Sequence, residues 1–156
     1  MILLAIGANL PAADGKLPQA TCRAAVEALH SLSHLAVVRL SRWHTTPPDP
    51  PSSQAWYCNG VVRLSGTADP ASLLRRLQAI EQRAGRVRSV ANAARVLDID
   101  IIAIGDLVRD SPDPVLPHPR AHLRRFVLAP LAEVAPGWTH PRLGRSVEEM
   151  LAALPA

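Results

Sequence analysis

Aromatic side chains are scarce in this sequence. They make up 3% of the 156 residues, with one tyrosine, Tyr57, and one phenylalanine, Phe126. Aliphatic side chains must therefore fill the core, and the 48% of residues that are hydrophobic are a sufficient supply. Because a chain of this length is typical of one domain, we expect residues 1–156 to fold as a single domain.

Cysteine and long apolar segments are also scarce. The two cysteines, Cys22 and Cys58, form no metal or redox motif, and we expect buried free thiols rather than a disulfide. No segment approaches the roughly 20 apolar residues that cross a membrane, and residues 1–7 lack the basic region of a signal peptide. These absences favour a cytoplasmic protein without a membrane partner. No zinc-ligand spacing links the histidines His30, His34, His44, His122 and His140.

Lysine is nearly absent, since Lys16 is the only one in the chain. Arginine therefore supplies almost all of the positive charge, with a formal net charge of +4 and a pI of about 10.0. The planar guanidinium group suits phosphates, so a nucleotide or a nucleic acid is a candidate ligand. A codon bias toward arginine, alanine and proline explains the composition equally well, which makes the charge a weak indication of partners.

The apolar patterns predict strands that alternate with helices. We expect strands at residues 2–6, 35–43, 57–64 and 96–104, and helices at 17–32, 69–84, 120–134 and 146–154. Helix ends are marked by Asp69, Gly85 and the capping box of Ser146 with Glu149. Prolines predict loops at 45–53 and 109–119. The predicted fold class is α+β, with helices packed on a ferredoxin-like, mainly antiparallel sheet.

Two aspartates in the last predicted strand are the strongest chemical signal. Side chains alternate along a strand, so Asp98 and Asp100 share one face while Leu97, Ile99 and Ile101 point into the core. Neighbouring like charges are unfavourable without a compensating cation. Mg²⁺ is usually held by one or two carboxylates plus substrate phosphates, so a metal site is one interpretation. An exposed strand face, or pairing with arginines, is the other.

A basic segment precedes this aspartate pair. Residues 85–95 carry three arginines, Arg86, Arg88 and Arg95. Beside a carboxylate–metal site, these arginines would bind a triphosphate. A solvated basic loop is the alternative interpretation.

Tyr57 and Asn59 lie two residues apart and share a strand face. A ring for stacking and an amide for paired hydrogen bonds suit a flat heterocycle. As a bare pattern this is weak, because a tyrosine on a strand usually serves packing.

Taken in order, these motifs resemble the 6-hydroxymethyl-7,8-dihydropterin pyrophosphokinase family. The ordered set covers nearly the whole chain, and its spacing is highly specific. Its segments are residues 6–10, 45–48, 57–59, 78–81, 85–88, 95–100, 116–119, 124–128 and 130–136. The resemblance implies an ATP-dependent diphosphokinase of folate biosynthesis, which transfers pyrophosphate from ATP to the hydroxymethyl group of the dihydropterin and releases AMP.

The resemblance also implies roles for individual residues. The catalytic set is Arg86, Arg88, Arg95, Asp98 and Asp100, with the two aspartates as ligands of two Mg²⁺ ions. The implied pterin-binding residues are Thr46, Pro47, Tyr57, Asn59 and Phe126. The implied ATP-binding residues are Gln78, Glu81, Arg88, Arg95, Ile101, His118 and Arg124. We expect a monomer whose partners are ATP and the pterin, without nucleic acid.

One loop departs from the family pattern. The family's usual Arg-Trp-Gly-Pro-Arg run corresponds here to Asn92-Ala93-Ala94-Arg95, which is one residue shorter and lacks the tryptophan and one arginine. This departure leaves open a second class, a pterin or nucleotide paralogue that only binds. A third class, a nucleic-acid-binding α+β domain, is disfavoured because the strands carry few aromatic rings for base stacking.

Overall fold

The computed structural model describes residues 1–9, 15, 17–47, 51, 56–85 and 96–155. The described strands are β1 (Ile2–Ala8), β2 (Leu35–Leu40), β3 (His44–Thr46), β4 (Tyr57–Gly66) and β5 (Asp98–Ile104). The described helices are α1 (Pro18–Leu29), α2 (Pro70–Arg83), a short 3₁₀ helix η1 (Ala121–Leu123), α3 (Arg125–Val134) and α4 (Val147–Ala152).

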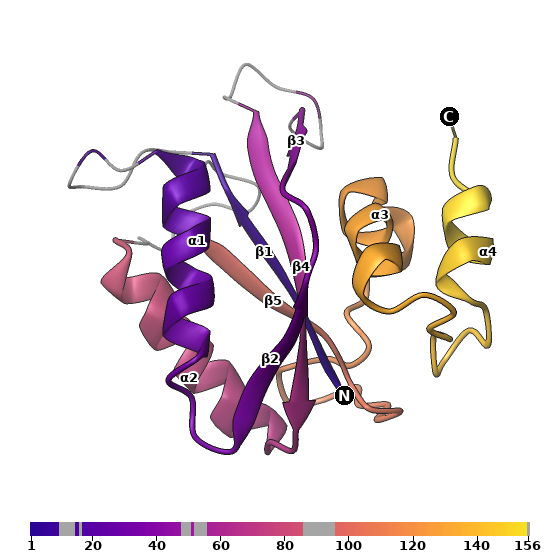
Figure 1. Ribbon diagram of the computed structural model, residues 1–156. Coiled ribbons are helices and arrows are strands. Elements are labelled where there is room, and N and C mark those ends of the chain that lie inside the picture. The colour runs from indigo at the N-terminus through magenta and orange to yellow at the C-terminus, as the bar shows by residue number, and fades with distance from the viewer. Residues whose placement is uncertain (10–14, 16, 48–50, 52–55, 86–95, 156) are drawn as a thin grey trace.

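The described strands form one antiparallel sheet (Figure 1). Its order is β2-β4-β1-β5, and β3 pairs with the start of β4. β1 is therefore central and antiparallel to both β4 and β5. The succession β1-α1-β2-β4-α2-β5 with this strand order is the ferredoxin-like arrangement. The predicted fold class is confirmed.

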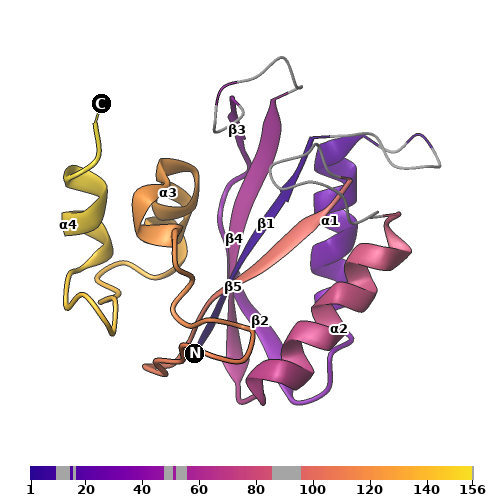
Figure 2. The ribbon, with the colours of Figure 1, turned by 180° about the vertical axis from the view of Figure 1, so that it is seen from behind.

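Helices cover both faces of the sheet. α1 and α2 lie on one face, and α3 and α4 lie on the other, as the two opposite views in Figure 1 and Figure 2 show. Along β1, Leu4 and Ile6 join the core beneath α1 and α2, whereas Leu3 joins the core beneath α3 and α4. A central strand buried on both faces needs a continuous apolar run, which explains the composition of residues 2–6.

Local signals in the sequence set the ends of two helices. The side chain of Asp69 accepts a hydrogen bond of 3.0 Å from the backbone N–H of Ser72, and a proline occupies the first turn of α2. Ser146 and Glu149 form the expected reciprocal capping box of α4. The cysteines are buried free thiols, as expected. Within the described residues, no helix is long and apolar enough to cross a membrane.

The prediction of one strand over residues 35–43 was wrong. β2 ends at Leu40, and β3 begins at His44 and takes in the first two residues of the expected loop. Ser41 lies at the interruption. Its Oγ accepts a hydrogen bond of 2.9 Å from the backbone N–H of Val61, and its own N–H donates to the Val61 carbonyl at 3.0 Å. A side chain therefore fills one position of the ladder, and the pairing with β4 resumes three residues later.

The predicted helix over residues 120–134 begins later than expected. The 3₁₀ turn of η1 precedes it, and Arg124 has an extended backbone with φ −120° and ψ 109°. This extended residue separates η1 from α3, so the prediction of one continuous helix was wrong, and residues 121–123 form a separate 3₁₀ turn. The prediction is confirmed for residues 125–134, since α3 continues through Pro130.

Candidate active site

Three residues form a row across the centre of the sheet. Gly7 on β1 pairs with Asn59 on β4 and with Asp98 on β5. Neighbouring strands are about 4.8 Å apart, so the amide and the carboxylate start from backbone positions roughly 10 Å apart. The strands that carry them begin at this end of the sheet, where β1 finishes. The row therefore brings together two residues that the sequence patterns indicated separately.

The next row has the same form. Ala5 pairs with Val61 on one side and with Asp100 on the other. Leu97, Ile99 and Ile101 are buried in the α1–α2 core, which confirms that the aspartates share the opposite face of β5. Asp98 and Asp100 are both partly exposed. The face that they occupy is the one covered further along by α3.

Gly7 is required by a close approach of side chain to backbone. A Cβ atom at this position would lie 2.8 Å from Oδ1 of Asn59. The absence of a side chain therefore lets the Asn59 amide lie over β1. Asn59 is 7% exposed, and its Nδ2 group donates a hydrogen bond of 2.5 Å to Oγ1 of Thr46 on β3. Thr46 thus holds the amide in place.

The other predicted pterin-binding residues come from the elements around this amide. Tyr57 pairs with Thr46 in the β3–β4 register and is partly buried. Pro47 follows β3 and is exposed. Phe126 lies in the first turn of α3, where it packs against the core beneath that helix, and the Arg124 guanidinium lies 5.4 Å from the centre of its ring. The cation–π geometry fixes the arginine beside the ring.

His118 lies beside the aspartate pair. Its backbone N–H donates to the Ile102 carbonyl at 2.9 Å, and its Nε2 atom is 4.0 Å from Oδ2 of Asp100. Its Nδ1 atom accepts a hydrogen bond of 3.1 Å from the backbone N–H of Arg120, so the neutral ring carries its proton on Nε2. Burial, with the positive charges of Arg124 and Arg120, lowers the pKa of His118 to about 4, although Asp98 acts in the opposite direction.

The predicted nucleotide-binding residues on α2 lie on the other side of β5. Glu81 is 2% exposed, and its Oε2 accepts a hydrogen bond of 2.8 Å from the backbone N–H of Ile99. Gln78, one turn earlier, is partly exposed. The side chain of Ile101 is buried in the core. Glu81 therefore fixes the start of β5 and, with it, the aspartates on either side of Ile99.

Arg86, Arg88 and Arg95 lie outside the described residues. Among the residues that are described, no group of three or more His, Cys, Asp and Glu side chains could hold a metal ion. Asp98 and Asp100 supply two carboxylates, which is the donor set that Mg²⁺ takes when phosphate oxygens complete its coordination. The residues present therefore fit a cation that binds together with a nucleotide.

The sequence patterns gave no role to His44 or Glu133. Nε2 of His44 lies 2.6 Å from Oε2 of Glu133, and Oε1 of the same carboxylate accepts a hydrogen bond of 2.9 Å from the backbone N–H of Arg42. These residues are about 90 positions apart in the chain, and a contact of that kind leaves no periodic signal. The only sequence feature was the presence of Glu133 in the family-like segment 130–136.

We predict that His118 remains neutral and protonated on Nε2 at pH 7, because burial and two arginines disfavour its charged form. ¹⁵N-detected NMR of the imidazole should show this tautomer, with titration near pH 4. The unfolded chain binds the proton first, at the usual histidine value of about 6.5, so this group should weaken the fold only as the pH falls from about 6.5 toward 4. A His118 ring already protonated at pH 6 would contradict the prediction.

Comparisons with known proteins identify the family of the chain. The model of the 7,8-dihydro-6-hydroxymethylpterin-pyrophosphokinase (HPPK) family matches residues 3–136. A 2-amino-4-hydroxy-6-hydroxymethyldihydropteridine pyrophosphokinase of Pseudomonas aeruginosa is 37% identical over 154 residues, which cover 99% of this chain and 91% of that protein. A protein of the same name from Synechocystis sp. is 37% identical over 131 residues, which cover 81% of this chain and 65% of that protein.

A solved structure shows the same fold. Plasmodium falciparum HPPK-DHPS has a TM-score of 0.67 and 13% identity, with 97% of this chain matched to 44% of that longer chain. The chain thus spans less than half of that protein and about two thirds of the Synechocystis one. The match to the family model covers most of the chain, and both of the relatives named above are 37% identical to it. The chain therefore belongs to the 7,8-dihydro-6-hydroxymethylpterin-pyrophosphokinase family.

Proposed function

We propose that this protein transfers pyrophosphate from ATP to the hydroxymethyl group of 6-hydroxymethyl-7,8-dihydropterin and releases AMP, as a step of folate biosynthesis. The observation that carries the proposal is the Asn59–Gly7–Asp98 row within a chain of this family. An amide suits the donors and acceptors of a pterin ring, and a carboxylate suits cation-bound phosphate. The proposal takes the cytoplasm as the compartment and a monomer as the working unit.

The pterin half of the site consists of residues from β3, β4 and α3. Tyr57 and Phe126 would stack on the two faces of the ring, because flat heterocycles and aromatic side chains favour such contacts. The Asn59 amide would hydrogen-bond the edge of the ring, with Thr46 fixing the amide and Pro47 completing that side. The single tyrosine and the single phenylalanine of the chain thus both serve substrate binding.

The ATP half is centred on the start of β5. Asp98 and Asp100 would hold two Mg²⁺ ions, which, when bound, would neutralise negative charge on the phosphates. Neutral His118 would donate a hydrogen bond from Nε2 to a phosphate oxygen, and Arg124 would contribute positive charge. The remaining contacts assigned to ATP are Gln78, Arg86, Arg88 and Arg95, while the buried Glu81 and Ile101 would support this half of the site from beneath β5.

The proposed reaction uses these residues as follows. The pterin hydroxyl oxygen attacks the β-phosphorus of ATP in line, its bond to phosphorus forms, and the bond from the β-phosphorus to the oxygen of AMP breaks. The hydroxyl proton leaves to solvent, since none of the described side chains of the site is placed as a strong base. Positioning by Asn59 and the two rings, and charge stabilisation by Arg86, Arg88 and Arg95, would supply most of the catalysis.

Replacing either aspartate should abolish turnover. Asp98→Ala and Asp100→Ala should each lower AMP release by more than about 100-fold, because even residues that only orient metal ligands contribute 10- to 100-fold. Asp106→Ala is the matched control, since this exposed aspartate follows β5 at its opposite end. Circular dichroism should show folded proteins throughout. A near-wild-type rate in either site variant would refute the metal assignment.

Gly7→Ala should weaken pterin binding selectively. The added methyl group would displace Asn59, because its carbon would stand 2.8 Å from the Asn59 Oδ1 atom. Loss of about one hydrogen bond, or about 1.4 kcal/mol, corresponds to a tenfold higher KM for the pterin. The KM for ATP should stay within about twofold of wild type on the same energy scale.

The Asn59→Ala background provides the control for this variant. Without the asparagine side chain, the methyl group at Gly7 meets no amide, so Gly7→Ala should add no further loss of pterin affinity. Additive losses in the double variant would show that Gly7 acts through something other than Asn59.

A further inference from the structure

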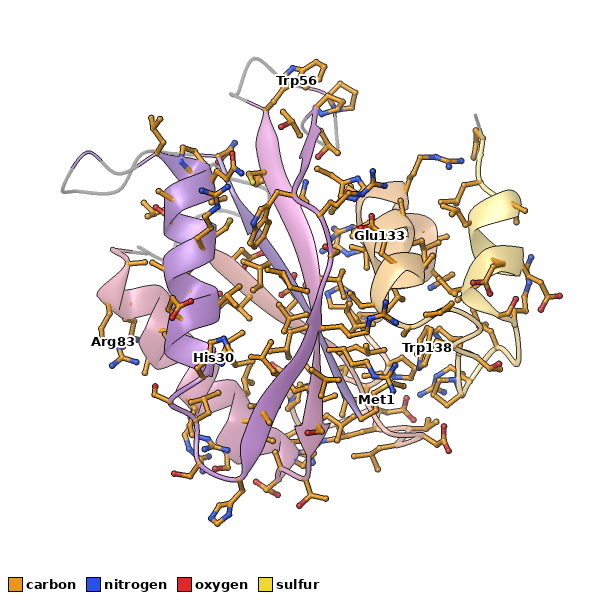
Figure 3. All side chains as sticks on the ribbon, viewed as in Figure 1. Met1, His30, Trp56, Arg83, Glu133 and Trp138 are labelled. Atoms are coloured by element: carbon orange, nitrogen blue, oxygen red, sulfur yellow. The ribbon has the colours of Figure 1, made fainter. Side chains whose placement is uncertain are left out.

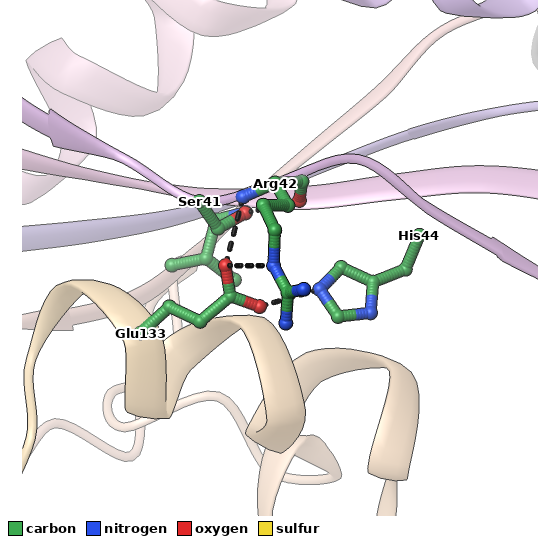
Figure 4. Close-up of polar contacts among 5 residues, drawn as sticks. Ser41, Arg42, His44 and Glu133 are labelled. Atoms are coloured by element: carbon green, nitrogen blue, oxygen red, sulfur yellow. Dashed lines mark hydrogen bonds and ion pairs between the residues drawn. The ribbon is translucent and has the colours of Figure 1, made fainter.

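One carboxylate on α3 joins that helix to the interruption between β2 and β3. Oε1 of Glu133 accepts hydrogen bonds from the backbone N–H of Arg42 at 2.9 Å and from its Nε at 3.3 Å. Oε2 lies 2.6 Å from Nε2 of His44. Figure 3 shows Glu133 on the side of α3 that faces the strands, and Figure 4 shows the contacts. A single side chain thus connects a helix and a strand segment from distant parts of the chain.

The contacts of Glu133 lead directly to the proposed pterin side of the site. His44 begins β3 and pairs in register with Asn59, and Thr46 ends β3 and accepts the hydrogen bond from the Asn59 amide. The carboxylate therefore acts on β3 one strand away from Asn59. A shift of β3 relative to α3 would move Thr46 and, through it, the amide.

On the helix, the same carboxylate is aligned with the proposed stacking ring. Phe126 and Glu133 are seven residues apart, which is about two turns and roughly 10 Å along the axis on one side of the helix. Both are partly buried. Since α3 is continuous through Pro130 and buries Leu128 and Leu131 between the two residues, fixing the helix at Glu133 also constrains Phe126 against the sheet.

The groups that contact Glu133 are a backbone N–H outside the strands and a partly buried histidine. Arg42 lies between β2 and β3, outside both strands. Its backbone N–H donates a hydrogen bond to the Glu133 carboxylate. The side chains of Glu133 and His44 are about a quarter exposed, whereas that of Arg42 is 82% exposed. Burial by itself would raise the pKa of Glu133, but the hydrogen bonds from the Arg42 backbone, His44 and the Arg42 side chain lower it below its usual range. The carboxylate is therefore charged at neutral pH.

We propose that Glu133 is a positioning residue for the pterin site. It holds β3, with Thr46 and the Asn59 amide, at a fixed distance from α3 and the Phe126 ring, without touching the substrate. The inference rests on the proposed function for its substrate, but the geometric link between β3 and α3 can be measured separately. Because exposed ion pairs contribute little, the backbone N–H and His44 carry the effect rather than the Arg42 guanidinium.

Kinetics of matched variants test this role. Glu133→Ala should raise the KM for the pterin about tenfold and His44→Ala severalfold, while the KM for ATP changes less than twofold. Arg42→Ala should resemble wild type, because it keeps the backbone N–H. Glu148→Ala is the control, since Glu148 also accepts hydrogen bonds from a backbone N–H, that of Gly137, but contacts neither Arg42 nor His44 in the described structure. The double variant of His44 and Glu133 should lose no more than Glu133→Ala alone.

Amide hydrogen exchange gives a second readout that needs no substrate. In Glu133→Ala, the amides of Arg42 and β3 should exchange at least tenfold faster than in wild type, while those of β5 remain unchanged. Equal rises in both KM values, unchanged KM values, or unchanged exchange at Arg42 and β3 would each overturn the proposal. If wild type releases no AMP and binds no pterin, the proposed function fails, and the exchange data alone decide whether Glu133 fixes β3 to α3.

Discussion

The central position of β1 is the constraint on which the site depends. Because β1 lies between β4 and β5, a side chain at Gly7 would stand between the Asn59 amide and the Asp98 carboxylate, and Ala5 lies in the next row, between Val61 and Asp100. Gly7 and Ala5 have no side chain or a small one on this face of β1, whereas Leu3 on the same face is large and buried. The change from large to small residues along one strand face marks where core ends and site begins.

One face of the sheet holds β5 in place, and the other face carries the proposed site. The α1–α2 face is buried along β5, and the Glu81 carboxylate on α2 accepts the Ile99 N–H from that side. The aspartates therefore project from a strand whose other face is held in place by the α1–α2 core. On the other face, α3 covers the sheet beside the site, and Glu133 sets how closely it approaches β3. The proposed pterin contacts lie between these elements.

The sequence predicted what depends on local periodicity. Alternation of Leu97, Ile99 and Ile101 correctly assigned the face of the two aspartates, and Asp69 and Ser146 correctly marked helix starts. It could not predict contacts between distant residues. The side chain of Ser41 replaces a ladder position opposite Val61, so a continuous apolar pattern became two strands. The contact of Glu133 with His44 is also a contact between distant residues, so no local pattern predicts it.

The site residues also differ in how far the sequence pattern alone could identify them. Asp98 and Asp100 stood out from the strand pattern alone, and Asn59 gave a weaker signal through its spacing from Tyr57, whereas His118 gained a role only through the family resemblance. The structure adds the reason why Asn59 is well placed, which is the missing side chain at Gly7. The roles of Arg86, Arg88 and Arg95 stay predictions, because these residues lie outside the described part of the chain.

The most direct test of the proposed reaction is a transfer experiment with wild-type protein and ATP labelled at the β-phosphorus. With Mg²⁺ and 6-hydroxymethyl-7,8-dihydropterin, we expect the label to move to the pterin as AMP appears in equal amount. Release of ADP with a monophosphorylated pterin would contradict pyrophosphoryl transfer. Tight binding of both substrates without any transfer of label would identify a protein that only binds.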